Sequence, residues 1–445
     1  MTKEDFLKQF FHTLNENKAD YFVYGEYSHL PKDTNGSDLD IYISSDDIHI
    51  AHQVFNKAIK EEGLKLVSYF SNTQALFYRF LYSKNNIHWG IQIDIFAKVY
   101  YHQNAAYYPM DRIKPYIKQH NNIHVLDISE AYYINFIKEI LHTGKAKEKY
   151  LKGFISKINI QPERISELKE LYGNKFTEIV KNNLSAETLP LQNKKLQKEI
   201  YHAIHRKDYI KRVQFYIHNL FRLINKRPGY VIAILGTDGS GKSTIINQIT
   251  PILNEGFHHG VIYNHLRPNV LPDIGVVLGK RKKAEEITVV SNPHAEKQSG
   301  LIGSLLRWGY YMIDYTVGYL KTVFPVIHTK SKVFIFDRYY YDYYIDPKRF
   351  KTSLPHWILK SGECFVPKPD LILCLGGEPE KIYSRKPETS LQEVTRQTNT
   401  LKKFCQTHKN AVWIDTCTDI ETSTNQAMEA ICKMMSKRFS NFKFQ

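Results

Sequence analysis

The sequence has few cysteines, and they do not lie in metal-binding or disulfide-framework patterns. Only five of the 445 residues are cysteine, all lie beyond residue 360, and no two form a CxxC pair. This excludes a disulfide-stapled scaffold, argues against a cysteine-based zinc site, and predicts a cytoplasmic protein. The 19 histidines form no HExxH motif, and the adjacent pair His258-His259 is expected to lie in a solvated loop.

Long apolar runs without charge are also missing. The first ten residues, MTKEDFLKQF, carry acids and lack the apolar core of a signal peptide. The most apolar stretch, Leu301 to Ile327, contains Arg307, Asp314 and Lys321, so a membrane-spanning helix is not expected. We expect a core or lid helix there, with a peripheral membrane contact as the alternative. The sequence shows no internal repeat and no low-complexity tract.

The composition is that of a globular protein with a basic surface. Hydrophobic residues make up 42% of the chain and charged residues 24%, and the length suggests two or three domains. The net charge of +16 arises almost entirely after residue 125. Such an excess is typical of proteins that bind nucleotides, phosphorylated sugars, nucleic acid or acidic lipid, and also of a lysine-rich solubilising surface.

The pattern of the chain divides it into three parts and predicts an α/β multidomain protein. Residues 1–125 alternate short strand-like runs with helices, which indicates an α+β domain. Residues 126–226 keep a helical period without strand-like runs and are interpreted as a helical connector. Residues 227–445 contain continuous apolar strands separated by helices, the pattern of a doubly wound, parallel α/β domain.

A phosphate-binding loop opens the third part. The segment Gly236–Ser243 (GTDGSGKS) matches GxxxxGK[ST] and lies between the strand-like run Tyr230–Leu235 and a helical segment. Backbone N–H groups of such a loop surround phosphate oxygens, helped by the positive end of the helix. We expect Lys242 to reach the β- and γ-phosphates of ATP and Ser243 to bind Mg²⁺. The predicted nucleotide-binding residues are Gly236, Asp238, Gly239, Ser240, Gly241, Lys242, Ser243 and Thr244.

Over residues 229–445 the chain resembles the thymidylate kinase family. The resemblance rests on the loop TDGSGKST, on Asp337-Arg338-Tyr339 at a strand end, on Pro369-Asp370-Leu371 with Pro379-Glu380, and on the basic pair Arg385-Lys386. It implies that Asp337 lies beside the metal and the acceptor hydroxyl and that Arg338 holds the acceptor. It further implies that Arg385 and Lys386 close over the transferred phosphoryl group, and that Arg267 contacts an acceptor phosphate.

The chain departs from that family after Arg338. The family has a serine and an AYQ stretch there, whereas residues 339–347 of this chain read YYYDYYIDP. The pocket that recognises thymidylate is therefore not evident, and we expect kinase chemistry on another acceptor. Asp342 and Asp346 are expected to cap a helix or a turn.

A second set of acidic residues lies in the first part of the chain. In Ser37-Asp38-Leu39-Asp40, side chains two positions apart point to the same side of a strand, so Asp38 and Asp40 project together. Asp94 lies on another alternating strand and is expected to complete a triad. Carboxylates this close repel one another unless cations hold them, and Mg²⁺ prefers such oxygen ligands.

Together with Gly25, which follows the strand-like run Tyr21–Tyr24, these residues resemble the nucleotidyltransferase fold of the polymerase-β-like superfamily over residues 20–125. The resemblance implies that Gly25 and Ser37 contact a nucleotide and that Asp38, Asp40 and Asp94 bind metal and take part in catalysis. The family usually has glycine or serine where this chain has Glu26, and an acid there would repel a triphosphate. The first domain is therefore either a working transferase or an inactive remnant that positions a substrate for its neighbour.

Taken together, these features predict a bifunctional kinase with a nucleotidyltransferase-like head. Its expected acceptor is a small or lipid-linked molecule with a hydroxyl or phosphate group. Because sugars and alditols are activated by phosphorylation and nucleotidylation, surface-polysaccharide synthesis is one setting, by analogy. A nucleic-acid-modifying or phage-defence protein and a nucleotide-switched scaffold with an inactive head are the alternatives. The basic segment Lys207–Lys226 could bind nucleic acid or an anionic membrane, or pack between the domains.

Overall fold

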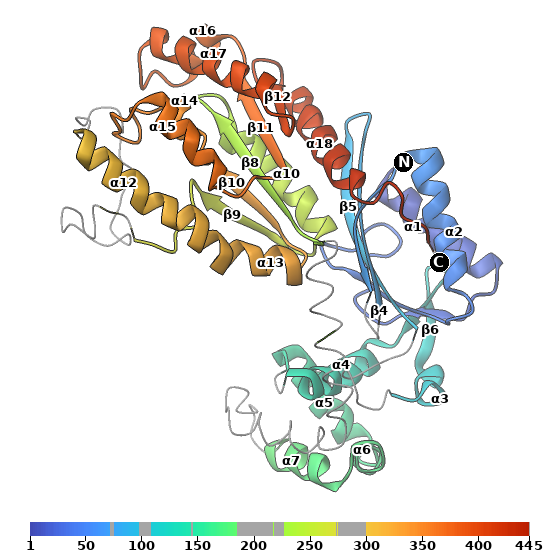
Figure 1. Ribbon diagram of the computed structural model, residues 1–445. Coiled ribbons are helices and arrows are strands. Elements are labelled where there is room, and N and C mark those ends of the chain that lie inside the picture. The colour runs from blue at the N-terminus through green and yellow to red at the C-terminus, as the bar shows by residue number, and fades with distance from the viewer. Residues whose placement is uncertain are drawn as a thin grey trace.

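The computed structural model describes residues 1–71, 75–97, 108–143, 146–184, 217, 227–272, 274 and 300–444. Figure 1 shows two α/β units side by side and a helical unit below the N-terminal one, with both marked chain ends on the N-terminal unit. Most of the predicted basic segment Lys207–Lys226 lies outside the described residues.

The N-terminal unit is built on a seven-stranded mixed sheet with the strand order β3-β4-β5-β2-β1-β7-β6. Its strands are β1 (Tyr21–Val23), β2 (Leu39–Ile43), β3 (Lys65–Ser71), β4 (Ala75–Lys84), β5 (Ile87–Phe96), β6 (Ile117–His120) and β7 (Ile123–Leu126). Helices α1 (Lys3–Glu16) and α2 (Ile48–Lys57) bury their apolar faces in one core with this sheet. Strands β2 and β5 run parallel, with Asp40 directly beside Asp94.

The helical unit follows β7 and forms a second core. Its helices are α4 (Ile128–Thr143), α5 (Glu148–Ile160), α6 (Arg164–Tyr172) and α7 (Asn174–Leu184), and a short α3 (Met110–Ile113) precedes β6. The fully buried Glu130 of α4 pairs with Lys157 and Arg164, each at 3.0 Å, and so ties three of these helices together. Aromatic and aliphatic residues of the first sheet also belong to this core, so the helical unit packs against that sheet.

The C-terminal unit contains the predicted parallel sheet, with the strand order β12-β11-β8-β10-β9. Its strands are β8 (Tyr230–Gly236), β9 (Val261–His265), β10 (Val333–Asp337), β11 (Leu371–Gly376) and β12 (Ala411–Asp415). Helices α10 (Lys242–Gly256) and α18 (Ile420–Lys437) share one core with the sheet. The second core, on the other face, includes α12 (Leu301–Ile313), the helical segment Asp314–Val323, α13 (Phe324–Thr329) and α17 (Leu391–Thr407). Because apolar residues cover both faces, the strands are continuous hydrophobic runs.

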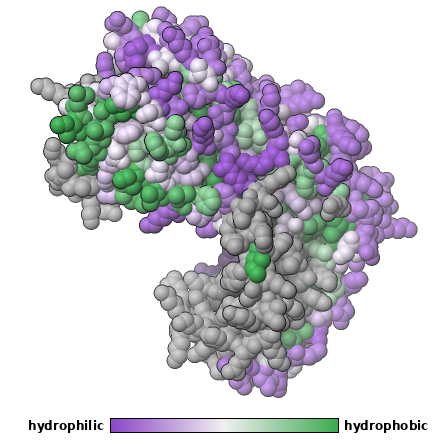
Figure 2. Space-filling model, in the orientation of Figure 1, coloured by the Kyte–Doolittle hydropathy of each residue, from purple (hydrophilic) through white to green (hydrophobic). Residues whose placement is uncertain are grey.

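The remaining described helices of this unit are α14 (Asp342–Ile345), α15 (His356–Ser361) and α16 (Pro379–Arg385). The stretch expected to form a core or lid helix is helical from Leu301 to Thr329. Met312, Tyr315 and Val323 are buried on one side, whereas leucines and isoleucines on the other side form an exposed apolar area that Figure 2 shows in green. Among the described helices, none has the length and apolar character needed to cross a bilayer.

The two α/β units are packed against each other through α10 and α18. Both helices contact strands of the first sheet as well as strands of the second, so they form a middle layer between the sheets (Figure 1). Val67 of β3 and Leu81 of β4 lie in the same hydrophobic cluster as Tyr230 and Met435. Near the C-terminus, Phe442 packs against Tyr69 of the first sheet with its ring tilted, at 4.5 Å between ring centroids.

Candidate functional sites

The phosphate loop has the predicted strand–loop–helix context. Strand β8 ends at Gly236, and α10 begins at Lys242. Gly239 and Gly241 have φ angles of +82° and +79°, a left-handed conformation in which a side chain would be strained. The loop lies at the carboxyl end of the central strand β8, where ligands of doubly wound sheets bind.

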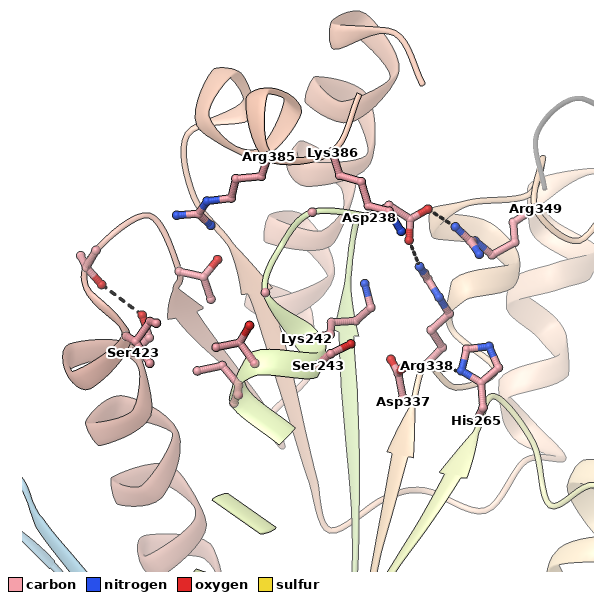
Figure 3. A pocket seen from close by; sticks show the side chains of 17 residues that line it. Asp238, Lys242, Ser243, His265, Asp337, Arg338, Arg349, Arg385, Lys386 and Ser423 are labelled. Carbon is pink, nitrogen blue, oxygen red and sulfur yellow. Dashed lines mark hydrogen bonds and ion pairs between the residues drawn. The ribbon is translucent and has the colours of Figure 1, made fainter. Parts of the chain in front are cut away.

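A cavity of about 610 Å³ opens at this loop. Figure 3 shows residues of the phosphate loop at its base, the pair Asp337-Arg338 at the end of β10 on one side, and Arg385 and Lys386 above. The sequence-predicted residues that line it are Asp238, Gly239, Gly241, Lys242, Ser243, Thr244, Asp337, Arg338, Arg385 and Lys386. Gly236 and Ser240 belong to the loop but do not line the cavity, and Ser240 is fully buried.

The side chain of Lys242 folds back onto the phosphate loop. Its ammonium donates hydrogen bonds to the carbonyl oxygens of Gly236, at 3.0 Å, and Thr237, at 2.8 Å. Burial and the neighbouring Arg338 guanidinium lower the pKa of Lys242 to about 7. A bound phosphate would supply the negative charge that this buried ammonium lacks.

Asp238 of the loop anchors two arginines. One carboxylate oxygen lies 2.5 Å from Nη2 of Arg338, and the other pairs with Arg349 (Figure 3). Burial opposes ionisation of Asp238, but the charges of Arg338 and Arg349 lower its pKa to about 2. The sequence predicts Asp238 as a nucleotide contact, whereas the structure shows it holding the arginines that line the cavity.

Arg349 is a cavity residue that sequence reasoning missed. It lies in the segment after α14 and also pairs with Asp346, at 3.3 Å. The signal available in the sequence was indirect, because the buried acids of residues 337–346 need cationic partners. Asp342 accepts a hydrogen bond from the backbone N–H of Tyr339, and Asp346 accepts one from the backbone N–H of Arg349. Both contacts agree with the expected turn role.

Asp337 offers an oxygen atom that suits a metal ion. The carboxylate is buried, and Oδ2 accepts a hydrogen bond from the Tyr263 hydroxyl at 3.1 Å and lies 3.5 Å from Nδ1 of His265. Oδ1 is buried without a hydrogen-bond partner among the described residues. Although burial disfavours the charge, His265 and Lys242 lower the pKa of Asp337, so the carboxylate is ionised. An ionised carboxylate with a free oxygen, together with the Ser243 hydroxyl on the cavity wall, fits a hard divalent cation.

Arg338 locks the end of β10 onto the phosphate loop. It has a φ of 72°, rare for a residue with a side chain, and its buried guanidinium donates to the Gly236 carbonyl at 3.3 Å. Strain of this kind persists where the surrounding contacts fix it, and it is common at functional sites.

Arg267 is not brought to the cavity. Its buried guanidinium lies 2.5 Å from Asp314, donates to the Leu271 carbonyl at 2.8 Å and stacks over Tyr311. Asp314 also accepts three backbone N–H groups of residues 269–271. The structure thus places Arg267 away from the cavity lining, where Asp314 neutralises its charge and fixes the loop.

The predicted carboxylate triad assembles in the N-terminal unit. Asp38, Asp40 and Asp94 each place an oxygen so that the three atoms lie within 4.8 Å of one another. Asp94 is buried and accepts two hydrogen bonds from the Gln92 amide. Burial and the nearby Asp38 raise the pKa of Asp40 to about 7, and burial with both neighbours raises the pKa of Asp94. Such mutual repulsion is relieved by a divalent cation, so the donor set fits Mg²⁺.

Three lysines also line this pocket, which has a volume of about 440 Å³. Lys138 of α4 donates to the Tyr24 hydroxyl at 2.7 Å, and Lys147 and Lys149 lie at the start of α5. These lysines belong to the segment interpreted as a connector, and nothing in their spacing marked them as site residues. The helical unit thus supplies part of the pocket.

Gly25, Glu26 and Ser37 also line this pocket. One carboxylate oxygen of Glu26 accepts the backbone N–H groups of Tyr27 and Ser28, each at 3.1 Å. These bonds lower the pKa of Glu26, so a negative charge is present at the rim, as the sequence suggested.

No family model and no curated protein matches the sequence. Solved structures with a similarity to part of the chain include thymidylate kinase from Ehrlichia chaffeensis, at 16% identity and a TM-score of 0.32, which covers 46% of this chain and 98% of that chain. Deoxyadenosine kinase from M. mycoides is similar in two structures, with dATP bound (15% identity) and with the products dCMP and dCDP bound (16% identity). Both have a TM-score of 0.29 and cover 45% of this chain and 98% of theirs. Similarities this weak carry no functional conclusion, which has to come from the geometry of the two sites.

Proposed function

We propose that the C-terminal unit is a kinase that uses ATP and Mg²⁺ to phosphorylate a small, phosphate-bearing acceptor. One observation carries this proposal: a phosphate loop, several arginines and an ionised aspartate converge on one cavity, and one oxygen of that aspartate has no hydrogen-bond partner in the described part of the chain. Positioning and charge neutralisation are the main requirements of phosphoryl transfer, and these groups supply both.

The nucleotide side of the cavity is the phosphate loop. Its N–H groups and Lys242 bind the phosphates, and the hydroxyl of Ser243 with Asp337 would hold Mg²⁺, which neutralises charge on the transferred group. Arg385 and Lys386 line the cavity above the loop, where they can contact the phosphoryl group as it moves (Figure 3).

The acceptor side lies next to Asp337. Arg338 and Arg349 both line the cavity, and the carboxylate of Asp238 holds the two guanidinium groups in place. Guanidinium groups fixed in this way can bind a phosphate group of the acceptor through two hydrogen bonds each. His265 and the free oxygen of Asp337 then face the hydroxyl or phosphate that receives the phosphoryl group.

The test is ADP release from ATP with a panel of nucleoside monophosphates, sugars, sugar phosphates, alditol phosphates and oligonucleotides. We expect at least one phosphorylated small molecule to stimulate release, and we expect Lys242→Ala to abolish the stimulation. The matched variant Asp38→Ala/Asp40→Ala leaves the kinase cavity intact and should keep it. ATP binding without stimulation by any acceptor would favour a nucleotide-switched scaffold, and stimulation by oligonucleotides alone would favour nucleic-acid modification.

A second activity, nucleotidyl transfer, is proposed for the carboxylate pocket. The observation that favours it is that the three clustered carboxylates share one cavity with three lysines. The carboxylates would hold Mg²⁺, and the lysines would bind the phosphates that leave as pyrophosphate. Acceptor-dependent pyrophosphate release that is lost in Asp38→Ala/Asp40→Ala and kept in Lys242→Ala is the expected result. An absence of release would identify the head as inactive.

A further inference from the structure

The C-terminal unit contacts the N-terminal unit at the end of α10. Glu255, in the last turn of α10, accepts hydrogen bonds from Nζ of Lys3, at 2.9 Å, and from the backbone N–H of Gly90, at 3.2 Å. Phe257 is buried in the core that the two units share. The residues that follow are therefore held in a fixed position beside the first sheet.

His258 projects from this turn into the carboxylate pocket. Its Nδ1 lies 3.6 Å from a carboxylate oxygen of Asp38. Among the described residues that line the pocket, His258 alone comes from the C-terminal unit, since the others lie between residues 24 and 150. The solvated loop pair expected from the sequence is exposed, but one member has a defined place in a site.

The charges around His258 indicate which ligand the pocket suits. The imidazole lines the same pocket as Lys138, Lys147 and Lys149, and the negative set of Asp38, Asp40 and Asp94 lines it as well. A bare cation would not use the lysines, and a bare anion would be repelled by the carboxylates. A polyphosphate chelated to a divalent cation satisfies both sets.

The backbone of the turn has an unusual conformation at both histidines. His258 and His259 have φ angles of 44° and 51°, in the left-handed region. Glycine, asparagine and histidine all occur in this conformation, so the backbone accepts an imidazole at position 258 without requiring one.

We propose that the carboxylate pocket is a composite site, in which His258 of the C-terminal unit donates a hydrogen bond to the phosphates of a metal-bound nucleoside triphosphate. This rests on the nucleotidyl-transfer function proposed for the pocket. His258 binds and positions the ligand, and the C-terminal unit is a structural part of the first site as well as a kinase.

The test measures binding of Mn²⁺, and of Mn²⁺ with inorganic tripolyphosphate, to the full chain by electron paramagnetic resonance. All proteins carry Lys242→Ala to weaken binding at the phosphate loop, and Asp38→Asn/Asp40→Asn reports the binding that does not involve the carboxylates. His258→Asn removes the imidazole but tolerates the left-handed backbone, and His259→Asn is the matched control on the same turn. We expect His258→Asn to weaken binding of the tripolyphosphate complex about tenfold, to leave Mn²⁺ affinity near its original value, and not to lower the melting temperature.

The remaining outcomes separate the two proposals. If Asp38→Asn/Asp40→Asn binds both probes as tightly as its parent, the proposed function of the pocket fails, and the composite site fails with it. If Asp38→Asn/Asp40→Asn weakens binding but His258→Asn binds the tripolyphosphate complex as tightly as His259→Asn, the composite site alone is overturned. A His258→Asn protein that loses Mn²⁺ as strongly as the complex, or that melts earlier, would show a metal-binding or structural role and would also overturn the proposal.

Discussion

Gly90 of β5 and Gly256 at the end of α10 bring the two α/β units into direct backbone contact. A Cβ atom built on Gly90 would lie 2.5 Å from the backbone nitrogen of Gly256 and 2.6 Å from the carbonyl oxygen of Ile252. Only glycine allows helix and sheet to approach this closely. Because α10 starts at the phosphate loop and the turn after it reaches the carboxylate pocket, this contact sets the position of one helix relative to both sites.

We therefore expect Gly90→Ala to destabilise the protein by about 1–3 kcal/mol, because the methyl group meets backbone atoms that cannot turn aside. Differential scanning fluorimetry should show a melting temperature lower by several degrees. Gly309→Ala is the matched control: it lies in α12, a Cβ there meets no described residue within 4 Å, and alanine favours the helix. A melting temperature for Gly90→Ala equal to that of Gly309→Ala would contradict the close packing of the two units.

Asp238 should contribute an acid-sensitive part of the stability. Its pKa is about 2 in the folded protein and near 3.8 when unfolded, because Arg338 and Arg349 outweigh the effect of burial. A group with a lowered folded pKa stabilises above the unfolded pKa, and this contribution disappears as pH falls through the folded pKa. The shift corresponds to about 2 kcal/mol, lost between roughly pH 4 and pH 2. Melting temperatures of the native protein and Asp238→Asn should therefore differ at pH 6 and converge toward pH 2; a constant difference would argue against the ion pairs.

Substitutions of Arg349 and Arg267 should differ in their main effect, which is on the acceptor KM for Arg349 and on stability for Arg267. Arg349→Met removes a cation that lines the kinase cavity, so the KM for the stimulating acceptor should rise about tenfold or more. Because Arg349 also pairs with Asp238 and Asp346, the melting temperature should fall as well. Arg267→Met leaves the fully buried Asp314 without its cation, so we expect a loss of about 3–5 kcal/mol in stability. Its acceptor KM, measured below the melting transition, should stay near the native value. Steady-state kinetics and thermal melts on both proteins decide the assignment, and a raised KM in Arg267→Met alone would reverse it.

The parts that were predictable from the sequence are those in which neighbouring residues act together. The phosphate loop is one contiguous segment, and its glycines, Lys242 and Ser243 carry their geometry in their spacing. Asp38 and Asp40 are linked by the two-residue period of a strand, and the parallel pairing of β2 with β5 places Asp94 beside them. The parallel C-terminal sheet followed from continuous apolar strands and is confirmed.

The parts that were not predictable depend on contacts between distant segments. Nothing in the sequence around Arg267 indicates that Asp314 neutralises it, and nothing around Arg349 indicates that it reaches Asp238. Lys138 lies on an ordinary amphipathic helix, and its place in the carboxylate pocket depends on how that helix packs. His258 enters a pocket of another unit only because α10 lies between two sheets, an arrangement that no local pattern expresses.

Lys242 should take up a proton when ATP binds. Burial and Arg338 lower its pKa to about 7, so near and above pH 7 much of the free protein carries a neutral amine. Phosphate oxygens favour the ammonium form, so binding should raise the pKa and draw a proton from the buffer. Isothermal titration calorimetry at pH 8 in buffers with different ionisation enthalpies should show an uptake of up to one proton per ATP, with affinity falling as pH rises from 7 to 9. Lys242→Arg, which stays charged throughout, is the matched control and should show neither effect. Equal proton uptake in both proteins would mean that another group titrates and that Lys242 is already charged before the nucleotide arrives.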